Sequence, residues 1–112
     1  PFEGRHFDGI VVANYLWRPL WPLLRQALAP GGLLLHETFA LGQETVGRPS
    51  RPAFLLAPGE LLSACAGLRV VAYEDGFEAT GEGGRFVQRI AAVNEAPGQP
   101  APVRYGLAGP AG

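Results

Sequence analysis

The most constraining feature of this chain is a strand, helix and strand pattern near its start. The run from Phe7 to Ala13 holds two valines and an isoleucine, and the run from Leu33 to Phe39 opens with three leucines. Such apolar strands are typical of parallel sheets, whose strands are covered on both faces. We therefore predict a right-handed crossover unit of an α/β sheet, with a connecting helix from Trp17 to Ala29.

The helix is predicted from a change in the spacing of the apolar residues. They recur at intervals of three and four residues, at Trp17, Leu20, Trp21, Leu24 and Leu28. Arg18 falls between them, on the side expected to face water. Pro19 and Pro22 fit the first helical turn, where a missing amide hydrogen costs little, and Gly31-Gly32 form the turn before the second strand.

The second half of the chain begins with a long connection and a short helix. The connection from Ala40 to Ala57 contains several glycines and prolines and has little periodicity. A connection of that length in a small domain is usually functional or mobile, and we expect it to lie over the strand ends. The helix opens at Pro58 and is closed by Gly67.

Two further strands are predicted after this helix. Leu68 to Tyr73 should form a strand that ends at the turn Glu74-Asp75-Gly76, and Arg85 to Val93 should form the next one. Only a glycine-rich loop joins them, so they are expected to be antiparallel neighbours or a long hairpin.

Length and composition predict one domain and a tail. A chain of 112 residues suits a single core, which we assign to residues 1–95. Residues 96–112 are almost wholly Pro, Gly and Ala, and we predict that they are disordered. The chain starts with Pro1 and contains no Met, which favours a fragment of a longer protein.

The charge and hydropathy patterns argue against two classes of partner. Nine arginines, no lysine and ten acidic residues give a net charge of -1. This composition provides no excess of positive charge for binding the phosphate backbone of a nucleic acid. The apolar runs are shorter than the roughly 20 residues of a membrane span. We predict a cytoplasmic protein without membrane contact, and the arginine-only basicity suggests GC-rich coding and a bacterial source.

The motifs of several enzyme classes are absent from the sequence. His6 and His36 lie far apart, with no second donor at ligand spacing, so no metal site is predicted. The Gly-x-Ser-x-Gly elbow of hydrolases is missing. Gly31-Gly32 precede a strand and Gly81 to Gly84 join two strands, so neither cluster presents helix amides to a phosphate. Cys65 is predicted to be a buried apolar residue and not a reactive thiol.

Polar residues at the ends of the first two strands are the candidates for a site, because ligands of open parallel sheets bind there. Asn14 can contact a ligand or cap the following helix. Glu37 and Thr38 end the next strand, where a carboxylate can act as a base or grip a polar substrate, or can be solvated or structurally paired. His36 is more often a satisfied histidine than a base.

Aromatic and basic residues near these positions leave alternatives open. Tyr15, Trp17 and Phe39 can line a substrate pocket or belong to the core. Arg48 and Arg51, in the long connection, can clamp an anionic substrate or simply solvate the loop.

Three segments together resemble a known family. They are the strand from Phe7 to Leu16 with Asp8 after its first aromatic, the turn Leu28-Ala-Pro-Gly-Gly32, and the strand from Leu33 to Phe39. This combination resembles the C-terminal half of class I S-adenosylmethionine-dependent methyltransferases, of the bacterial tellurite-resistance-like or small-molecule type. The resemblance covers roughly residues 7–93.

The resemblance implies a partial Rossmann-like sheet. The family's strand order is three, two, one, four, five, seven, six with the last strand antiparallel, so these strands correspond to four, five, six and seven and the first half is missing. The family's glycine-rich cofactor loop and the acidic residue for the ribose also precede this part. Residues Ala13, Asn14, Tyr15 and Leu16 are then expected to contact the cofactor, and Glu37, Thr38 and Phe39, with Arg48 of the connection, to face the methyl acceptor.

An isolated C-terminal half would leave a sheet edge uncovered. Ile10, Val11 and Val12 would lie on a bare apolar edge, a hazard for aggregation. We expect a homodimer partner, another chain or an upstream segment to cover it. Three functions stay open: part of a small-molecule methyltransferase, inactive alone; a non-catalytic truncated module for dimerisation or protein contact; and a different doubly wound enzyme, such as a reductase.

Overall fold

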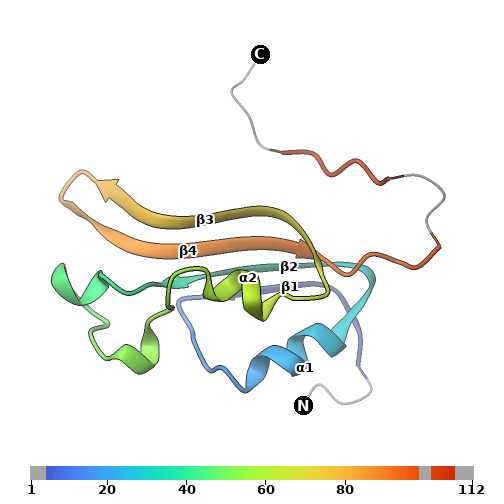
Figure 1. Cartoon of the computed structure of the whole chain (residues 1–112), viewed down its shortest axis with the longest axis horizontal. Coiled ribbons are helices and arrows are strands. Elements are labelled where there is room, and N and C mark those ends of the chain that lie inside the picture. The colour runs from blue at the N-terminus through green and yellow to red at the C-terminus, as the bar shows by residue number, and fades with distance from the viewer. Residues whose placement is uncertain (1–4, 99–101, 108–112) are drawn as a thin grey trace.

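The computed structural model describes residues 5–98 and 102–107, and its centre is one four-stranded sheet (Figure 1). The strands are β1 (Phe7–Ala13), β2 (Leu28–Phe39), β3 (Arg69–Thr80) and β4 (Gly83–Val93). Two α-helices, α1 (Leu20–Ala27) and α2 (Glu60–Ala64), and two short 3-10 helices, η1 (Gln43–Thr45) and η2 (Pro52–Phe54), complete the described elements.

The order and directions of the strands confirm the predicted topology. The order across the sheet is β1-β2-β4-β3. β1 is parallel to β2, and β4 is antiparallel to both β2 and β3. If β1 to β4 correspond to strands four to seven of the family, as the resemblance implies, this is the family's order four, five, seven, six. β4 then corresponds to the antiparallel last strand. The crossover from β1 through α1 to β2 is therefore the parallel unit expected from the apolar runs.

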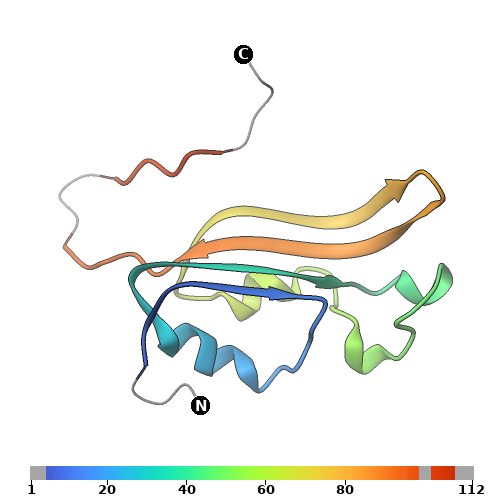
Figure 2. The same ribbon diagram turned by 180° about the vertical axis from the view of Figure 1, so that it is seen from behind.

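Both helices lie on the same side of the sheet (Figures 1 and 2). Trp21 and Leu24 of α1 and Leu61 of α2 are buried in one cluster with Leu34 of β2 and Ile90 of β4. This cluster forms the core of the described domain, so a single helical layer covers one face of the sheet.

The other face of the sheet is not covered by the described residues. Leu34 is fully buried on the helix side, whereas Leu33 and Leu35, which point to the opposite side, are 36% and 39% exposed. Val11 of β1 is 73% exposed. The strands thus carry apolar residues on both faces, as predicted, but the expectation that both faces are covered is wrong for this part of the chain.

The predicted boundaries of α1 and β2 need correction. α1 begins at Leu20, not at Trp17, and Trp17 is 53% exposed outside the predicted apolar stripe. Residues 17–19 form an i→i+3 turn instead, with the Leu20 N–H donating to the Trp17 carbonyl oxygen at 3.0 Å, and Pro22 has no amide hydrogen to donate to Arg18 as an α-helix would require. β2 already begins at Leu28, and the predicted glycine turn is an irregularity within it, with Gly31 at a φ of 83°.

β3 also extends beyond its predicted end. The predicted turn Glu74-Asp75-Gly76 lies inside β3, which continues to Thr80 and forms a long hairpin with β4. Glu74 pairs with Arg89 across the hairpin, and their side chains form an ion pair. Cross-strand pairing of this kind outweighs the local turn preference of Glu-Asp-Gly.

Two local predictions about α2 are confirmed. Gly67 follows the helix with a φ of 91°, and Cys65 is buried, with 1% exposure. Burial raises the pKa of the Cys65 thiol to about 11, so the thiolate form needed for reactivity is disfavoured. No helix among the described residues is long and apolar enough to cross a membrane.

The predicted disorder of residues 96–112 falls partly on residues 99–101 and 108–112, which lie outside the described residues. Within the described remainder no helix or strand is formed. The Tyr105 hydroxyl donates to Glu95 at 3.0 Å, and the guanidinium of Arg69 lies 5.6 Å from the centre of the Tyr105 ring. Disorder of the tail stays a prediction.

Candidate functional site

A cavity of about 330 Å³ lies where β1 and β2 end, and we call it the strand-end cavity. Its lining residues are Asn14, Tyr15, Leu16, Thr38, Phe39, Pro49 and Phe54. Five of these seven were predicted as cofactor or acceptor residues, and they come from two different strand ends. The structure thus brings members of both predicted groups together in one cavity.

The turn after β1 shapes one wall of this cavity. The Asn14 backbone N–H donates to the Glu37 carbonyl oxygen at 2.8 Å, and Asn14 has a φ of 56°. Asparagine tolerates this left-handed conformation better than most residues do. Because α1 begins only at Leu20 with Pro19 at its N-cap, the alternative in which Asn14 caps the helix is wrong.

His36 lies beneath the same turn. Its Nε2 is 3.0 Å from the Tyr15 carbonyl oxygen, and its ring is 4.6 Å from that of Trp21. The side chain is 4% exposed, and Nδ1 has no hydrogen-bond partner. A neutral ring that donates from Nε2 to Tyr15 satisfies the geometry. Burial lowers the pKa of His36, although the Tyr15 carbonyl acts in the opposite direction, so His36 supports the cavity wall and is not placed as a base.

The lowered pKa of His36 predicts a pH dependence of stability. The unfolded chain takes up the proton at higher pH than the folded chain, so stability present above pH 6.5 is lost as the pH falls towards the folded pKa. Chemical denaturation between pH 7.5 and 5.5 should show the free energy of unfolding decreasing. His36→Phe should flatten this slope, whereas His6→Gln, at an exposed position, should leave it unchanged. An unaltered slope in His36→Phe would contradict the assignment.

The long connection reaches the cavity through Pro49 and Phe54, which confirms that it lies over the strand ends. Gln43 holds one part of it. The Gln43 Oε1 accepts from the Phe86 backbone N–H at 2.9 Å, and its Nε2 donates to the Arg48 carbonyl oxygen at 3.1 Å. Gln43 is 5% exposed, so these buried hydrogen bonds fix the residue that precedes Pro49.

Arg18 holds the other part of the connection. Its guanidinium donates to the carbonyl oxygens of Ala53 at 3.1 Å and Leu55 at 3.0 Å, on either side of Phe54. It also forms a bidentate ion pair with the Glu60 carboxylate, in which Nε lies 2.5 Å from Oε2 and Nη2 lies 2.9 Å from Oε1. The hydrogen bond from Arg18 lowers the pKa of Glu60 and raises that of Arg18. We call this arrangement the Arg18 clamp.

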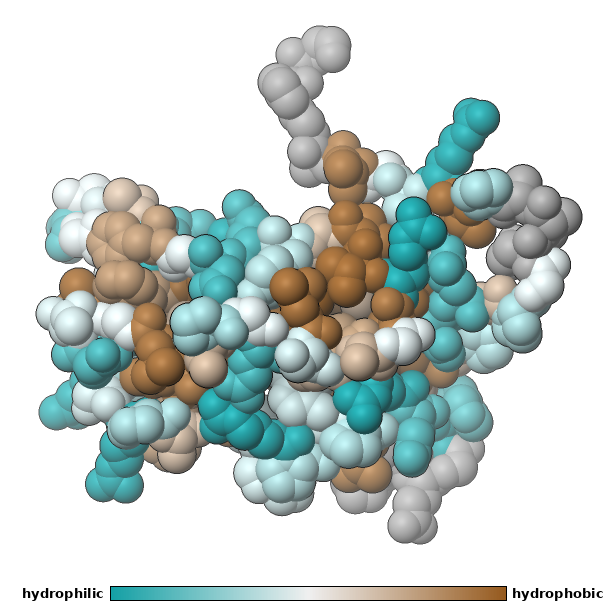
Figure 3. Space-filling view, viewed as in Figure 1, coloured by the Kyte–Doolittle hydropathy of each residue, from teal (hydrophilic) through white to brown (hydrophobic). Residues whose placement is uncertain are grey.

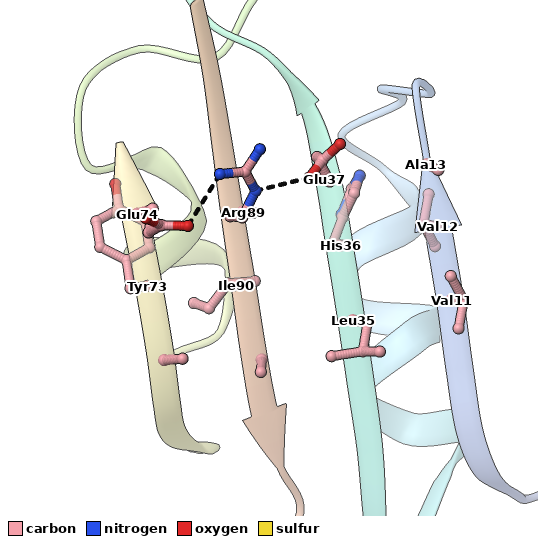
Figure 4. A pocket seen from close by; sticks show the side chains of 12 residues that line it. Val11, Val12, Ala13, Leu35, His36, Glu37, Tyr73, Glu74, Arg89 and Ile90 are labelled. Carbon is pink, nitrogen blue, oxygen red and sulfur yellow. Dashed lines mark hydrogen bonds and ion pairs between the residues drawn. The ribbon is translucent and has the colours of Figure 1, made fainter. Parts of the chain in front are cut away.

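A second cavity, of about 380 Å³, lies on the open side of the sheet, and we call it the sheet-face cavity (Figure 4). All four strands contribute to it. Ala13 and Glu37 line this cavity and not the strand-end cavity, because successive residues of a strand point to opposite faces. The predicted cofactor and acceptor residues are therefore divided between two hollows.

Glu37 is engaged in an ion-pair cluster at the sheet-face cavity. Its carboxylate lies 2.7 Å from Arg89 Nε and 3.1 Å from Arg85 Nη2. Arg89 also contacts Glu74 at 2.9 Å and Glu78 at 2.8 Å, and Figure 4 shows its guanidinium between Glu37 and Glu74. The hydrogen bond from Arg89 lowers the pKa of Glu37. Glu37 is therefore a structurally paired carboxylate, which was one of its predicted alternatives, and this pairing does not favour a role as a general base.

The remaining predicted residue, Arg48, lines neither cavity and is exposed. Only its backbone carbonyl is held, by Gln43. Sequence reasoning missed the roles of Gln43, Phe54 and Arg18, whose contacts join segments distant along the chain. Among the described residues no group of three or more His, Cys, Asp or Glu could hold a metal ion.

Solved structures of other proteins share this fold. TehB from Haemophilus influenzae superposes with a TM-score of 0.63, at 16% identity, over 81% of this chain and 36% of its own. An S-adenosylmethionine-dependent methyltransferase from Methanosarcina mazei gives 0.58 at 14% identity, over 83% and 63%. The N-methyltransferase NodS from Bradyrhizobium japonicum gives 0.58 at 20% identity, over 82% and 53%. This chain has the fold of part of a methyltransferase domain.

The chain spans less than two thirds of the length of each of these structures. At such identities the likeness establishes the fold alone. No protein-family model matches the sequence, and no curated protein matches it. The structural likeness agrees with the resemblance found in the sequence and with the observed strand order.

Proposed function

We propose that this chain is the C-terminal part of an S-adenosylmethionine-dependent methyltransferase that acts on a small molecule. The observation that supports this most is the strand-end cavity, which combines the turn Asn14 to Leu16 with Thr38 and Phe39. In open α/β sheets, ligands bind at such carboxyl ends of neighbouring strands.

The residues of the strand-end cavity suit one side of a cofactor site. Asn14 offers an amide side chain for which the structure shows no hydrogen bond, and Tyr15 is 53% exposed beside it. The turn from β1 to α1, residues 14–19, contains no glycine, and Gly42 after β2 caps only the three-residue 3-10 helix η1. The chain therefore supplies a wall of the site, and the main cofactor loop belongs to another segment. Bound S-adenosylmethionine supplies an electrophilic methyl group.

Catalysis under this proposal depends on positioning. Tyr15 and Thr38 present hydroxyl groups at the cavity, whereas His36 is buried behind the wall and Glu37 is paired on the other face. The described cavity lining therefore holds no histidine or carboxylate to act as a strong base. Holding the acceptor in line with the methyl group can itself supply much of the rate enhancement.

The open edge and face of the sheet support the proposal that a further segment completes the domain. β1 has β2 as its one neighbour among the described strands. Val11 is 73% exposed on this edge strand, and Leu33 and Leu35 are exposed on the face beside it. A bare apolar edge pairs readily with another chain. An upstream segment covers it in the complete protein, and a second copy covers it when this chain is alone.

Association through this edge can be tested with a charge on β1. Light scattering after size exclusion should show the 112-residue chain above monomer mass at tens of micromolar, and Val11→Lys should shift it towards the monomer. Val46→Lys, a control at a position 49% exposed in the long connection, should behave as the unsubstituted chain does. A stable monomer of the unsubstituted chain would contradict the covering of β1 by a second copy.

The alternative is a non-catalytic module that keeps this part of the fold for protein contact. It is favoured by the ion pairs that engage Glu37 and by the absence of a glycine-rich cofactor loop from the described residues. The two functions differ in one respect, since only the first includes transfer of a methyl group.

Methyl transfer by a longer protein that contains this chain distinguishes them. Transfer from isotope-labelled S-adenosylmethionine to a small-molecule library should be detected, and Asn14→Gly should lower its rate about 10- to 100-fold, because misplacing the reacting groups is costly. Glycine retains the left-handed turn at this position. Gln26→Gly, at an exposed position of α1, serves as the control. An undiminished rate in Asn14→Gly would exclude Asn14 from the site.

A further inference from the structure

We propose that the acceptor bound in the strand-end cavity is an uncharged molecule that carries a planar ring. This inference rests on the proposed function, since it assigns the substrate class of the same cavity. The aromatic residues that line the cavity, the location of the nearby charges and the Arg18 clamp support it.

Three aromatic rings from separate parts of the chain line the cavity. Tyr15 follows β1, Phe39 ends β2, and Phe54 belongs to η2. Tyr15 and Phe54 are 53% and 48% exposed, and Figure 3 shows apolar residues at the left of this face, where the long connection and the tip of the β3–β4 hairpin both lie. Half-exposed rings around a hollow offer stacking and edge contacts to another ring. A volume of about 330 Å³ is in the range of small-molecule sites.

The described lining of the cavity contains no charged side chain. None of the cationic groups in this part of the structure lines the cavity. Arg18 is paired with Glu60, Arg85 and Arg89 are paired with carboxylates at the sheet-face cavity, and Arg48 and Arg51 are exposed outside the lining. An anionic acceptor would lose hydration without gaining a partner, which disfavours its binding. Asn14 and Thr38 provide neutral polar groups that can orient a neutral ligand.

The Arg18 clamp positions Phe54 without lining the cavity. Its hydrogen bonds to the carbonyl oxygens of Ala53 and Leu55 fix the backbone on both sides of that ring. Glu60 in turn holds Arg18 and accepts from the Ala57 backbone N–H at 2.9 Å. Arg18 is thus a positioning residue, and its loss should weaken ring binding while the ligand keeps every contact with the other lining residues.

Three probes of nearly equal shape and different charge test the inference. Benzamide, benzoate and benzamidinium can each be titrated at millimolar concentration into the isotope-labelled 112-residue chain, with the amide resonances of Asn14, Leu16, Thr38 and Phe39 followed by NMR. Benzamide should shift these resonances, and benzoate should bind at least about tenfold more weakly. Benzoate binding as tight as benzamide, benzamidinium binding tenfold tighter, or no shifts with any probe would each overturn the inference.

Variants separate the roles of the ring and of the clamp. Phe54→Ala should weaken benzamide binding about tenfold, and Arg18→Gln should weaken it several-fold although Arg18 does not line the cavity. Arg51→Gln alters an exposed arginine of the same connection for which the structure shows no side-chain hydrogen bond, and should have no effect. Equal weakening by Arg18→Gln and Arg51→Gln would show a general charge effect and reject the clamp.

Failure of this inference and failure of the proposed function can be told apart. Probe binding by the 112-residue chain requires neither cofactor nor methyl transfer. A charged acceptor methylated by the longer protein would refute the substrate class alone. Absence of methyl transfer, together with benzamide binding at the cavity, would refute the proposed function alone.

Discussion

Replacing Gln88 with leucine is expected to lower the free energy of unfolding by about 3 kcal/mol, because buried hydrogen-bonding groups lose their partner. The Gln88 side chain is fully buried at the centre of β4. Its Nε2 donates to the Ala57 carbonyl oxygen at 2.6 Å, and its Oε1 accepts from the Leu61 backbone N–H at 3.2 Å. These bonds join the sheet to the start of α2.

The Tyr73 hydroxyl contributes less to this loss. It lies 3.0 Å from Gln88 Oε1 and also 3.2 Å from Asp75 Oδ2, so it retains a partner in the variant. Leucine adds apolar burial that offsets part of the cost. The net loss should nonetheless be large, since each unsatisfied buried group costs about 1 to 3 kcal/mol.

Urea denaturation followed by circular dichroism measures the effect of Gln88→Leu. The matched control is Gln26→Leu, the same change at an exposed position of α1, which should alter stability by less than about 0.5 kcal/mol. If both variants unfold at the same urea concentration as the unsubstituted chain, the hydrogen bonds of Gln88 do not hold α2 to the sheet.

Much of the sheet was predictable because its strands have strong local patterns. β1 was predicted with its observed bounds from an apolar run, and β4 to within two residues at its start. The short connection between β3 and β4 was enough to predict that they are antiparallel. These features depend on neighbouring residues, which a single sequence shows directly.

Features that depend on distant pairing were not predictable in the same way. The passage of β3 through Glu74-Asp75-Gly76 depends on ion pairs that join Glu74 and Glu78 to Arg89 across the hairpin. The start of α1 was mistaken for a different reason, because the apolar spacing continues through Trp17 while residues 17–19 form an i→i+3 turn and Pro22 lacks the amide hydrogen for an α-helical bond to Arg18.

The residues of the site show the same difference between local patterns and long-range contacts. Asn14, Tyr15 and Thr38 were predicted because they follow apolar strands, and they do line the strand-end cavity. Glu37 was predicted on the same ground, yet the alternation of a strand turns it to the opposite face. Phe54 and the Arg18 clamp were missed, since their place depends on how the long connection folds back over the strand ends.

Binding of S-adenosylmethionine is expected to differ at least about a hundredfold between this chain and a longer protein that contains it. The 112-residue chain offers the wall formed by Asn14 to Leu16, but the turn from β1 to α1 contains no glycine, and Gly42 after β2 caps only the 3-10 helix η1. Most of the contacts that hold the cofactor would come from the segment that pairs with β1. A hundredfold change in affinity corresponds to about 2.7 kcal/mol.

Calorimetric titration of S-adenosylmethionine into the two proteins distinguishes a divided cofactor site from a complete one. We expect micromolar affinity for the longer protein, weakened by Asn14→Gly, and no binding tighter than about 1 mM by the 112-residue chain, a difference of roughly 4 kcal/mol. Micromolar binding by the 112-residue chain, or none by the longer protein, would contradict the claim that this chain forms one part of a divided cofactor site.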